Sequence, residues 1–512
     1  MARINSNVPS LIAQSNLGRT QRTLNDTLAR LSTGLRITRG ADDPAGLIVS
    51  ERLRSELRGI EQGIANSERA SNVIATTEGA LAEVSDLLNS IKALVVEAAN
   101  TGAFSPDEIE ANQLQVDSAI ESITRISNTA SFAGLRLLNG SLGYTVSGVD
   151  NSEILRAKIF GASFFDRSNV PVDVEVLGSA QTANLYMRGD FSTLVGGATD
   201  GVLPSTTTIE IAGPDGVAEL TFVSGTTIDD MITAINTRSG TTGISAARVS
   251  ATNVSSGIVF SSTTYGSEAF VSVRETTDVT ATQFGVITNN GAPPAVWGSN
   301  VSIADRDDGK DVVVLVNGSV ATGRGLDVLL RSPELDLELT LDAAFAQTVS
   351  GTPSSFDITG GGSLYQLGPV VNANQQVNVG ISSIAATRLG GTLNSVNGNL
   401  ELQFLSSLKS GGVNDLLKGN LANASNVLET AIEEIAELRG RLGSFERNVL
   451  QTNIRSLQAG FENITAAESV IRDADFAQET AELSRLQVLQ QAGTSVLATA
   501  NTNAQSVLTL LG

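Results

Sequence analysis

Helical spacing of apolar residues at both ends of the chain constrains its fold more than any other feature. The spacing runs from about residue 5 to 137, and its first leucines are separated by seven, four, three and four residues: Leu17, Leu24, Leu28, Leu31 and Leu35. Near the C-terminus a similar register runs from Leu428 to Val449 and, after a shift of one residue, resumes at Leu450. Sustained three–four spacing is typical of coiled coils. We therefore expect the two ends to pack on each other, the alternative being a separate helical domain at each end.

The middle of the chain, from about residue 140 to 400, has a different period. The segment "LDLELTLD" (335–342) alternates strictly, and "VVVLVNGSV" (312–320) predicts a strand that ends in an Asn-Gly turn. A hairpin is predicted over 208–222 and a short helix over 227–240. The expected fold is α+β, with an antiparallel, coiled-coil helical rod formed by both termini and a β-rich domain inserted between them.

The C-terminal 27 residues, 486–512, carry no charge, although the formal net charge of the chain is −21. A surface helix normally displays charge on its outer face. A membrane span needs about 20 consecutive, mostly apolar residues, and glutamines and asparagines such as Gln490, Gln491 and Asn501 interrupt this stretch. The remaining interpretation is a helix that other protein chains surround.

The composition excludes several classes of enzyme. The chain contains no Cys and no His, so disulfides, thiolate chemistry, Ser-His-Asp hydrolysis and HExxH zinc sites are absent. We therefore expect no enzyme activity, no catalytic residue, no metal and no cofactor. The sequence pI of about 4.5 argues against nucleic-acid binding, and we expect no membrane span.

Two acidic motifs have both a functional and an ordinary interpretation. "DDP" (42–44) presents adjacent carboxylates, but without His or a basic partner at fixed spacing it is better interpreted as a solvated linker between helices. "DRDDGKD" (305–311) is similar to a calcium loop, but Gly309 stands where an EF-hand needs an oxygen ligand and no Glu closes the loop. A polar turn is the favoured interpretation.

Long stretches near both ends resemble the bacterial flagellin family. They are "LSTGLRITRGADDPAGLIVSERLRSELRGI" (31–60), "ATTEGALAEVSDLL" (75–88) and "SVIRDADFAQETAELSRLQVLQQAGTSVLATAN" (469–501). The similarity covers about 1–140 and 421–512. Shorter segments, 222–250 and 361–384, are similar to a repeat of the family's variable region and to the β segment that returns to the rod.

The resemblance implies a structural subunit that self-assembles into the bacterial flagellar filament for swimming motility. It implies a homopolymer in a helical filament, contacts with hook-associated junction and cap proteins, and a flagellar export chaperone. It also implies a secreted, extracellular protein exported by a type III channel, and we expect no secretory signal peptide. The implied domains are an inner coiled-coil segment (1–43 with 466–512, disordered in the monomer), a helical rod with β segments (44–175 with 362–465) and a variable β-rich part (176–361).

The same resemblance implies which residues contact neighbouring subunits. In the N-terminal segment these are Leu17, Leu24, Leu28, Leu31 and Leu35, and in the C-terminal segment they are Leu489, Gln490, Gln491, Gly493, Val496, Leu497, Val507, Leu508 and Leu511.

The family is also recognised by an innate immune receptor through a helix that matches 87–100. Leu94 fits the recognised pattern, whereas Ser90 and Gln115 stand where strongly recognised members have Arg and Glu. Because Ser and Gln do not replace charged contacts, we expect weak receptor binding. Ser/Thr clusters at 250–257 and 261–267 are interpreted as ordinary strand and loop residues or as O-glycosylation sites.

Two other functions stay open at this point. One is a hook–filament junction protein, which shares the rod but would lack the C-terminal pattern present here. The other is a filament subunit whose β-rich part is an added adhesive domain, although that part contains no aromatic cluster to favour binding.

Overall fold

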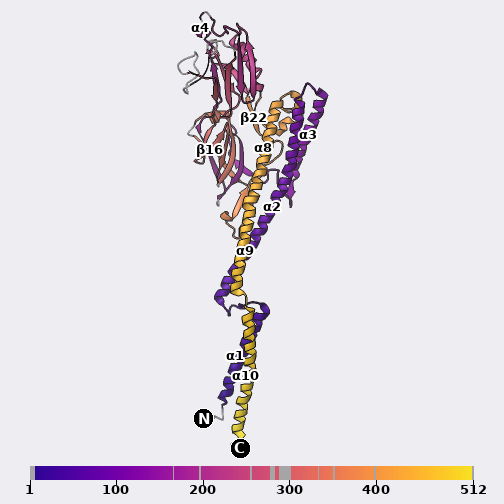
Figure 1. Ribbon diagram of the computed structural model, residues 1–512, viewed down its shortest axis with the longest axis vertical. Coiled ribbons are helices and arrows are strands. Elements are labelled where there is room, and N and C mark those ends of the chain that lie inside the picture. The colour runs from indigo at the N-terminus through magenta and orange to yellow at the C-terminus, as the bar shows by residue number, and fades with distance from the viewer. Residues whose placement is uncertain are drawn as a thin grey trace. The chain divides into compact units, whose positions relative to one another are not determined.

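A computed structural model of the chain describes residues 6–164, 167–194, 196, 198–253, 256–276, 283–287, 301–332, 334–349, 352–396 and 399–509 (Figure 1). The chain forms two compact units, each built from segments distant in sequence. Unit 1 comprises Met1–Ser71, Tyr365–Gln376 and Phe445–Gly512, and unit 2 comprises Asn72–Leu364 and Val377–Ser444. The expected α+β fold is confirmed, because long helices occupy both ends and sheets fill the middle.

The helices are concentrated near the two ends of the chain. The α-helices are α1 (Val8–Thr33), α2 (Pro44–Ala98), α3 (Pro106–Thr129), α4 (Phe191–Leu194), α5 (Ile228–Asn236), α6 (Ser239–Thr242), α7 (Ala343–Gln347), α8 (Leu421–Phe445), α9 (Gln451–Arg472) and α10 (Phe476–Thr509). Short 3-10 turns are η2 (Ala373–Gln375), η3 (Leu405–Leu408) and η4 (Leu416–Lys418), and η5 (Glu446–Leu450) is a π-helical turn.

The π-turn η5 explains the one-residue shift in the C-terminal apolar register. A π-turn closes i→i+5 hydrogen bonds and so accommodates one more residue than an α-helical turn. It lies between α8 and α9, where the register passes from Val449 to Leu450, and Leu450 is fully buried. The extra residue therefore lets the helical segment continue after the shift, with Ile454, Leu457 and Phe461 of α9 half-buried.

The strands of the middle region belong to unit 2, apart from one hairpin shared with unit 1, and every pairing described is antiparallel. They are β1 (Ser131–Phe132), β2 (Leu135–Arg136), β3 (Tyr144–Ser147), β4 (Ile154–Ala162), β5 (Val170–Gly178), β6 (Asn184–Met187), β7 (Thr207–Gly213), β8 (Gly216–Phe222), β9 (Ile244–Arg248), β10 (Ile258–Ser262), β11 (Phe270–Glu275), β12 (Phe284–Ile287), β13 (Val301–Ile303), β14 (Arg306–Asp308), β15 (Val313–Val316), β16 (Ser319–Arg324), β17 (Asp327–Arg331), β18 (Leu335–Leu341), β19 (Ser354–Gly361), β20 (Ser363–Gln366), β21 (Gln376–Val379), β22 (Thr392–Val396) and β23 (Asn399–Gln403).

Most of these strands form two lobes, each with its own core, while β1-β2, β20-β21 and β22-β23 are separate two-stranded sheets. The first lobe is a sheet of eight strands in the order β3-β19-β5-β15-β16-β17-β18-β4, and its core includes Val174, Val314 and Leu339. The second lobe has two sheets, ordered β13-β12-β6-β10-β9 and β14-β11-β7-β8, which share a core that includes Phe260 and Ile211. With few aromatics available, both cores are built mainly from aliphatic side chains.

Several local predictions are confirmed by the strands and turns. The Asn-Gly turn joins β15 to β16 with both residues at positive φ, Asn317 at 50° and Gly318 at 78°. The predicted hairpin is formed by β7 and β8, and the predicted short helix is α5, in which the Thr227 side chain accepts from the backbone of Asp230. These elements could be predicted because hairpin turns and helix caps each require particular residue types.

One expected boundary needs correction, and a second falls inside a strand. Helical spacing suggests a rod helix to residue 137, but α3 ends at Thr129 and a tight hairpin follows, with Ala133 and Gly134 at positive φ. The boundary expected at residue 175 falls inside β5, and β3 and β4 pair with β19 and β18 of the same sheet. Sheet pairing joins strands that are far apart in sequence, so the eight-stranded lobe includes β3 and β4, and the domain division at residue 175 stays a prediction.

Candidate subunit interface

Helices α1 and α10 of unit 1 form an antiparallel pair, the two lying side by side in Figure 1. Helix α1 begins where the Asn7 side chain accepts a hydrogen bond from the Ser10 backbone, and it ends at Gly34, whose φ of 73° suits glycine. The ends of the pair are joined at Asn7 Nδ2, which donates to the Ala500 carbonyl over 3.1 Å, and at Arg30, which lies 3.3 Å from Glu479. The prediction that the two chain ends pack on each other is confirmed.

Polar side chains as well as apolar ones line the seam between α1 and α10. Gln490 Nε2 donates to Gln21 Oε1 over 2.9 Å, and Ser10 Oγ donates to Asn501 Oδ1 over 2.9 Å. At Gly493 the helices approach closely, because an added Cβ would lie 3.3 Å from Leu17 Cδ1. Uncharged amide side chains therefore form hydrogen bonds between the two helices, at positions where an unpaired charge would be costly to bury.

The predicted contact residues divide between this seam and the outside. Leu24 is buried, and those half-buried in the pair are Leu17, Leu31, Gln490, Gly493 and Leu497. Leu35 is also half-buried, but it lies just after α1, where it forms a β-bridge with Asp473. Those that project outward are Leu28, Leu489, Gln491 and Val496. Leu511 lies outside the described residues, as do the side chains of Val507 and Leu508. The structure places one group within the chain and leaves the other available to neighbours.

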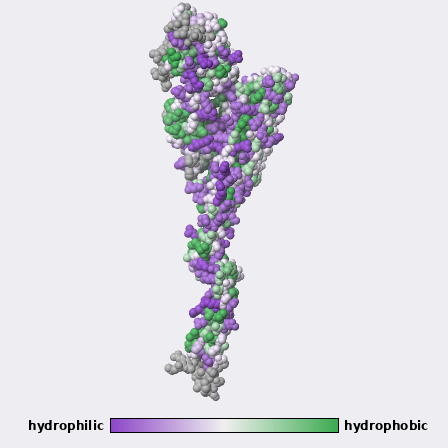
Figure 2. Space-filling model, in the orientation of Figure 1, coloured by the Kyte–Doolittle hydropathy of each residue, from purple (hydrophilic) through white to green (hydrophobic). Residues whose placement is uncertain are grey.

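Further apolar side chains of the pair are exposed that the sequence reasoning missed. Among the side chains that the structure describes, the exposed large apolar residues of the α1–α10 pair, which include the predicted Leu28, Leu489 and Val496, are Val8, Leu11, Ile12, Leu28, Phe476, Val488, Leu489 and Val496. In Figure 2 green apolar patches lie along this pair. Val488 is 67% exposed, and Leu489, the next residue of α10, is also exposed. Consecutive helical residues project about 100° apart, so apolar surface faces more than one side.

The segments that lead out of the pair are tied together by backbone bonds. Arg36 N–H donates to the Arg472 carbonyl over 2.7 Å, and Ala474 N–H donates to Gly34 over 2.9 Å. The "DDP" motif lies here, and Asp42 accepts from the Thr38 side chain and the backbone of Arg39, an arrangement that lowers its pKa, with the Thr38 hydrogen bond as the main cause. Asp43 accepts from Gly46 N–H at the start of α2. Both carboxylates therefore shape a turn, as the linker interpretation expects.

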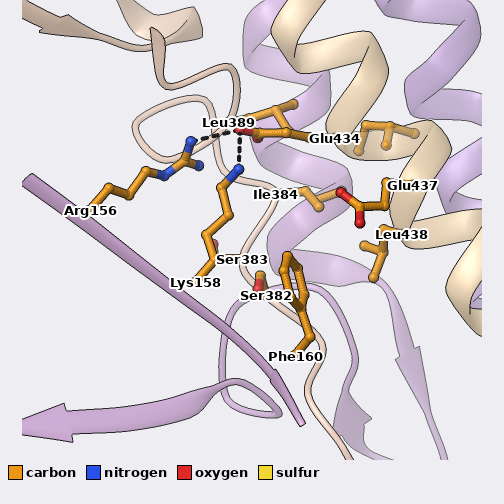
Figure 3. A pocket seen from close by; sticks show the side chains of 11 residues that line it. Arg156, Lys158, Phe160, Ser382, Ser383, Ile384, Leu389, Glu434, Glu437 and Leu438 are labelled. Carbon is orange, nitrogen blue, oxygen red and sulfur yellow. Dashed lines mark hydrogen bonds and ion pairs between the residues drawn. The ribbon is translucent and has the colours of Figure 1, made fainter. Parts of the chain in front are cut away.

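A charged clamp in unit 2, defined as Glu434, Arg156, Lys158 and Glu338, joins α8 to the eight-stranded sheet. Figure 3 shows Arg156 and Lys158 pointing toward the Glu434 carboxylate. The Glu434 carboxylate on α8 lies 2.7 Å from Arg156 Nη1 and 3.0 Å from Lys158 Nζ, both on β4, and also accepts from Gly390 N–H over 3.0 Å. Lys158 reaches Glu338 on β18 as well, over 2.7 Å. A cavity of about 60 Å³ adjoins the clamp.

The electrostatics of the clamp indicate a structural role. Burial acts to raise the pKa of Glu434, but Lys158, Arg156 and the Gly390 N–H outweigh it, so the pKa lies below its ordinary value. The carboxylate is therefore ionised at neutral pH and fully engaged by its partners. A group in that state is held as an ion-pair partner and does not act as a general acid.

The described residues contain no group of three or more His, Cys, Asp or Glu side chains that could hold a metal ion. The segment proposed as an alternative calcium loop forms strand β14, which pairs with β11. Asp307 accepts from the Asn184 backbone, whereas Asp311 accepts from Ser267 and Gly325. Its carboxylates thus bind separate protein donors. Within the same described part of the chain, no helix is long and apolar enough to cross a membrane.

The residues of the expected receptor segment lie on two helices of unit 2. Ser90 is exposed on α2, where its hydroxyl donates to the Asp86 carbonyl over 2.9 Å, and Leu94 is half-buried one turn further on. Gln115 is exposed on α3. Both uncharged replacements therefore stand at the surface, and the predicted weakness of receptor binding stays a prediction.

Comparisons with known proteins agree with the terminal helices and the inserted lobes. Residues 4–142 match the family "Bacterial flagellin N-terminal helical region", 426–511 match "Bacterial flagellin C-terminal helical region", and 208–264 match "Flagellin hook IN motif". The chain is 29% identical to a flagellin of Salmonella rubislaw and 28% identical to one of Escherichia coli K12, with 99% of each chain covered in both pairs. A flagellar junction protein from Legionella pneumophila is 11% identical, covers 83% of this chain and is itself covered completely, with a TM-score of 0.27.

Proposed function

Because this chain belongs to the bacterial flagellin family and is a structural subunit of the flagellar filament that serves motility, we propose that its copies join through the exposed apolar residues of the α1–α10 pair. Covering one Val, Leu, Ile or Phe side chain contributes about 1.5–3 kcal/mol, so eight such residues supply a substantial driving force.

The observation that carries this proposal is the direction in which these side chains project. Val488 and Leu489 are consecutive in α10 and both exposed, so one flat partner surface does not cover both. A symmetric dimer covers one patch per subunit, whereas a head-to-tail contact that does not close generates a filament with several neighbours for each subunit. Apolar surface on more than one side of the pair favours the filament.

Charge supports the same surface. A chain with net charge −21 repels its own copies. The described part of α10 beyond Arg485 presents no charge, so copies approach there without placing like charges in contact. We propose that the uncharged tail and the exposed apolar residues together define where copies of this chain meet.

The domain assignment and its dynamics are part of the proposal. We assign 1–43 with 466–512 to the inner coiled coil, disordered before assembly, 44–175 with 362–465 to the rod with its β segments, and 176–361 to the variable part. Coupled folding uses about 2–5 kcal/mol or more of the contact energy. That cost makes growth depend on an existing filament end.

Flagellins polymerise, and the filament they form is extracellular. We propose that this chain also contacts hook-associated junction and cap proteins, that a flagellar export chaperone binds it, and that it leaves the cell through a type III export channel. We further propose weak activation of the innate immune receptor, since Ser90 and Gln115 offer no charge. A cell reporter assay in which the purified monomer equals a strongly recognised flagellin would contradict that last point.

Seed extension tests the proposed assembly surface. Purified full-length chain and a variant that ends at Arg485 are heat-dissociated, cooled and incubated with short filament seeds, and seed length is measured by electron microscopy. Circular dichroism confirms that the sheets of unit 2 have refolded in both. We expect the full-length chain to extend the seeds and the variant to stay monomeric. Equal extension by both would overturn the proposal.

A further inference from the structure

The eight-stranded sheet of unit 2 wraps around its own core, which therefore has two ends. Its edge strands β3 and β4 are bridged by Tyr144, whose hydroxyl accepts from Ala162 N–H over 2.9 Å. Helix α7 covers the end where β5 finishes, because Ala346 is fully buried there and its carbonyl accepts from Ala180 N–H over 3.0 Å. At the opposite end, where β5 begins, lies a cavity of about 510 Å³.

The lining of this cavity, which we call the mouth cavity, comes from several strand ends. They are the segment after β4, the start of β5, and the turns that join β15 to β16 and β17 to β18. Val316, Leu330 and Leu335 supply a buried apolar floor. Cavities of about 300–1,000 Å³ with apolar walls and a few convergent polar groups are typical of small-molecule sites. The mouth cavity has the size and the floor of such a site.

Two polar side chains of the lining brace its rim. Asn317 Oδ1 accepts from Asp173 N–H over 2.8 Å, and its Nδ2 donates to the Pro171 carbonyl over 2.9 Å. Ser332 Oγ donates to the Leu335 carbonyl and accepts from Leu335 N–H, each over 3.0 Å. Both turns are thus held in one conformation, so a ligand does not have to order them when it binds.

Four other polar side chains of the lining have no hydrogen-bond or ion-pair partner among the residues that the structure describes: Ser163, Arg167, Ser319 and Glu334. The guanidinium of Arg167 and the carboxylate of Glu334 are both exposed, and they are not paired with each other. One apolar cavity therefore presents a cation, an anion and two hydroxyls that are all available to a ligand.

We propose that the mouth cavity binds a zwitterionic α-amino acid with an aliphatic side chain. Arg167 binds the carboxylate, since a guanidinium and a carboxylate form two parallel hydrogen bonds. Glu334 binds the ammonium, and the aliphatic side chain packs on the apolar floor. A ligand with only a negative charge would meet the Glu334 carboxylate, and one with only a positive charge would meet Arg167; like charges placed together are costly. A zwitterion satisfies both groups at once.

Equilibrium dialysis of radiolabelled L-leucine against the purified full-length monomer tests this proposal. We expect the chain to retain leucine, and Arg167→Gln and Glu334→Gln each to weaken binding by about tenfold or more, because each removes one charge-assisted contact. The matched controls are Arg238→Gln and Glu219→Gln, which change exposed residues of the second lobe. Both controls should bind leucine as the unsubstituted chain does, and circular dichroism confirms that all four variants are folded.

Competition separates the two charges of the ligand. Isocaproate has the leucine side chain and carboxylate without the ammonium, and isoamylamine has the ammonium without the carboxylate. We expect each to displace labelled leucine at least about tenfold less effectively than unlabelled leucine does. The proposal is overturned if the unsubstituted chain retains no leucine, if Arg167→Gln or Glu334→Gln binds as well as its control, or if either competitor equals leucine. The site lies in the eight-stranded lobe, so these results do not depend on the proposed assembly surface.

Discussion

The carboxylate of Glu434 on α8 lies 3.0 Å from the ammonium of Lys158 on β4, and each of the two side chains is 15% exposed. Removing one partner of a buried ion pair leaves the other charge uncompensated, at a cost of about 3–5 kcal/mol. We therefore expect Glu434→Gln to lower the free energy of unfolding by about that amount in urea titrations. Glu429→Gln, which removes the exposed pair with Lys92, should cost at most about 1 kcal/mol.

The same carboxylate predicts a dependence of stability on pH. The pKa of Glu434 lies below its ordinary value of 4.5, because Lys158 and Arg156 outweigh the effect of burial. A lowered pKa in the folded state contributes stability that is complete above about pH 4.5 and is lost as the pH falls through the folded value. The difference in free energy of unfolding between the unsubstituted chain and Glu434→Gln should thus shrink from pH 7 to pH 3. A difference that stays constant would contradict this assignment.

The clamp could not have been predicted from the sequence, whereas the rod could. Lys158, Glu338 and Glu434 stand about 100 to 280 positions apart, and no local pattern relates them. The leucines from Leu17 to Leu35 repeat with helical period, and a helical repeat near the C-terminus indicates that the two ends pack together. That C-terminal repeat lies in α8 and α9, however, and the helix that pairs with α1 is α10, beyond it. Long-range pairing of strands is similarly hidden, which is why the sequence alone does not show that residue 175 lies within β5.

Glycines at two positions of α2 should respond in opposite ways to the same substitution. An added Cβ at Gly79 meets nothing within 4 Å, so Gly79→Ala should stabilise the chain by about 0.5–1 kcal/mol. At Gly59 the Cβ would lie 2.9 Å from Pro369 Cβ and 3.0 Å from its carbonyl oxygen. We expect Gly59→Ala to destabilise the chain despite its better helix propensity. Thermal unfolding of both variants checks the pair, and equal stabilisation would show that the loop 365–376 yields easily.

Tyr144 should resist ionisation. Burial raises its pKa to about 12, while its oxygen accepts a hydrogen bond from Ala162 N–H over 2.9 Å. A raised pKa contributes stability that is present below the ordinary value of 10.0 and is lost as the pH rises toward 12. Tyr144→Phe should cost about 1–2 kcal/mol at pH 7, and this difference should decrease between pH 10 and 12. Ionisation of all four tyrosines near pH 10 by ultraviolet absorbance would contradict the prediction.

The predicted contact residues between subunits stay a prediction. Repeating leucines place residues on one helix, but they do not show whether a given leucine faces α10 or the outside of the pair, because that depends on how the two helices are rotated. Leu24 is buried within the pair, whereas Leu28 is 46% exposed four residues later. The shift between Val449 and Leu450 was visible in the sequence, and only the structure identifies it as a π-turn.

The critical concentration for seed extension tests the central claim most directly. Val488→Ser/Val496→Ser removes two exposed apolar side chains of the α1–α10 pair, and Val223→Ser/Val320→Ser makes the same changes at two exposed positions of unit 2. Covering a valine contributes about 1.5 kcal/mol or more, and each 1.4 kcal/mol is tenfold in affinity. We predict that the first variant needs at least about tenfold more protein to extend seeds than the second, with both folded by circular dichroism. Equal critical concentrations for the two variants would contradict the claim that this pair joins the subunits.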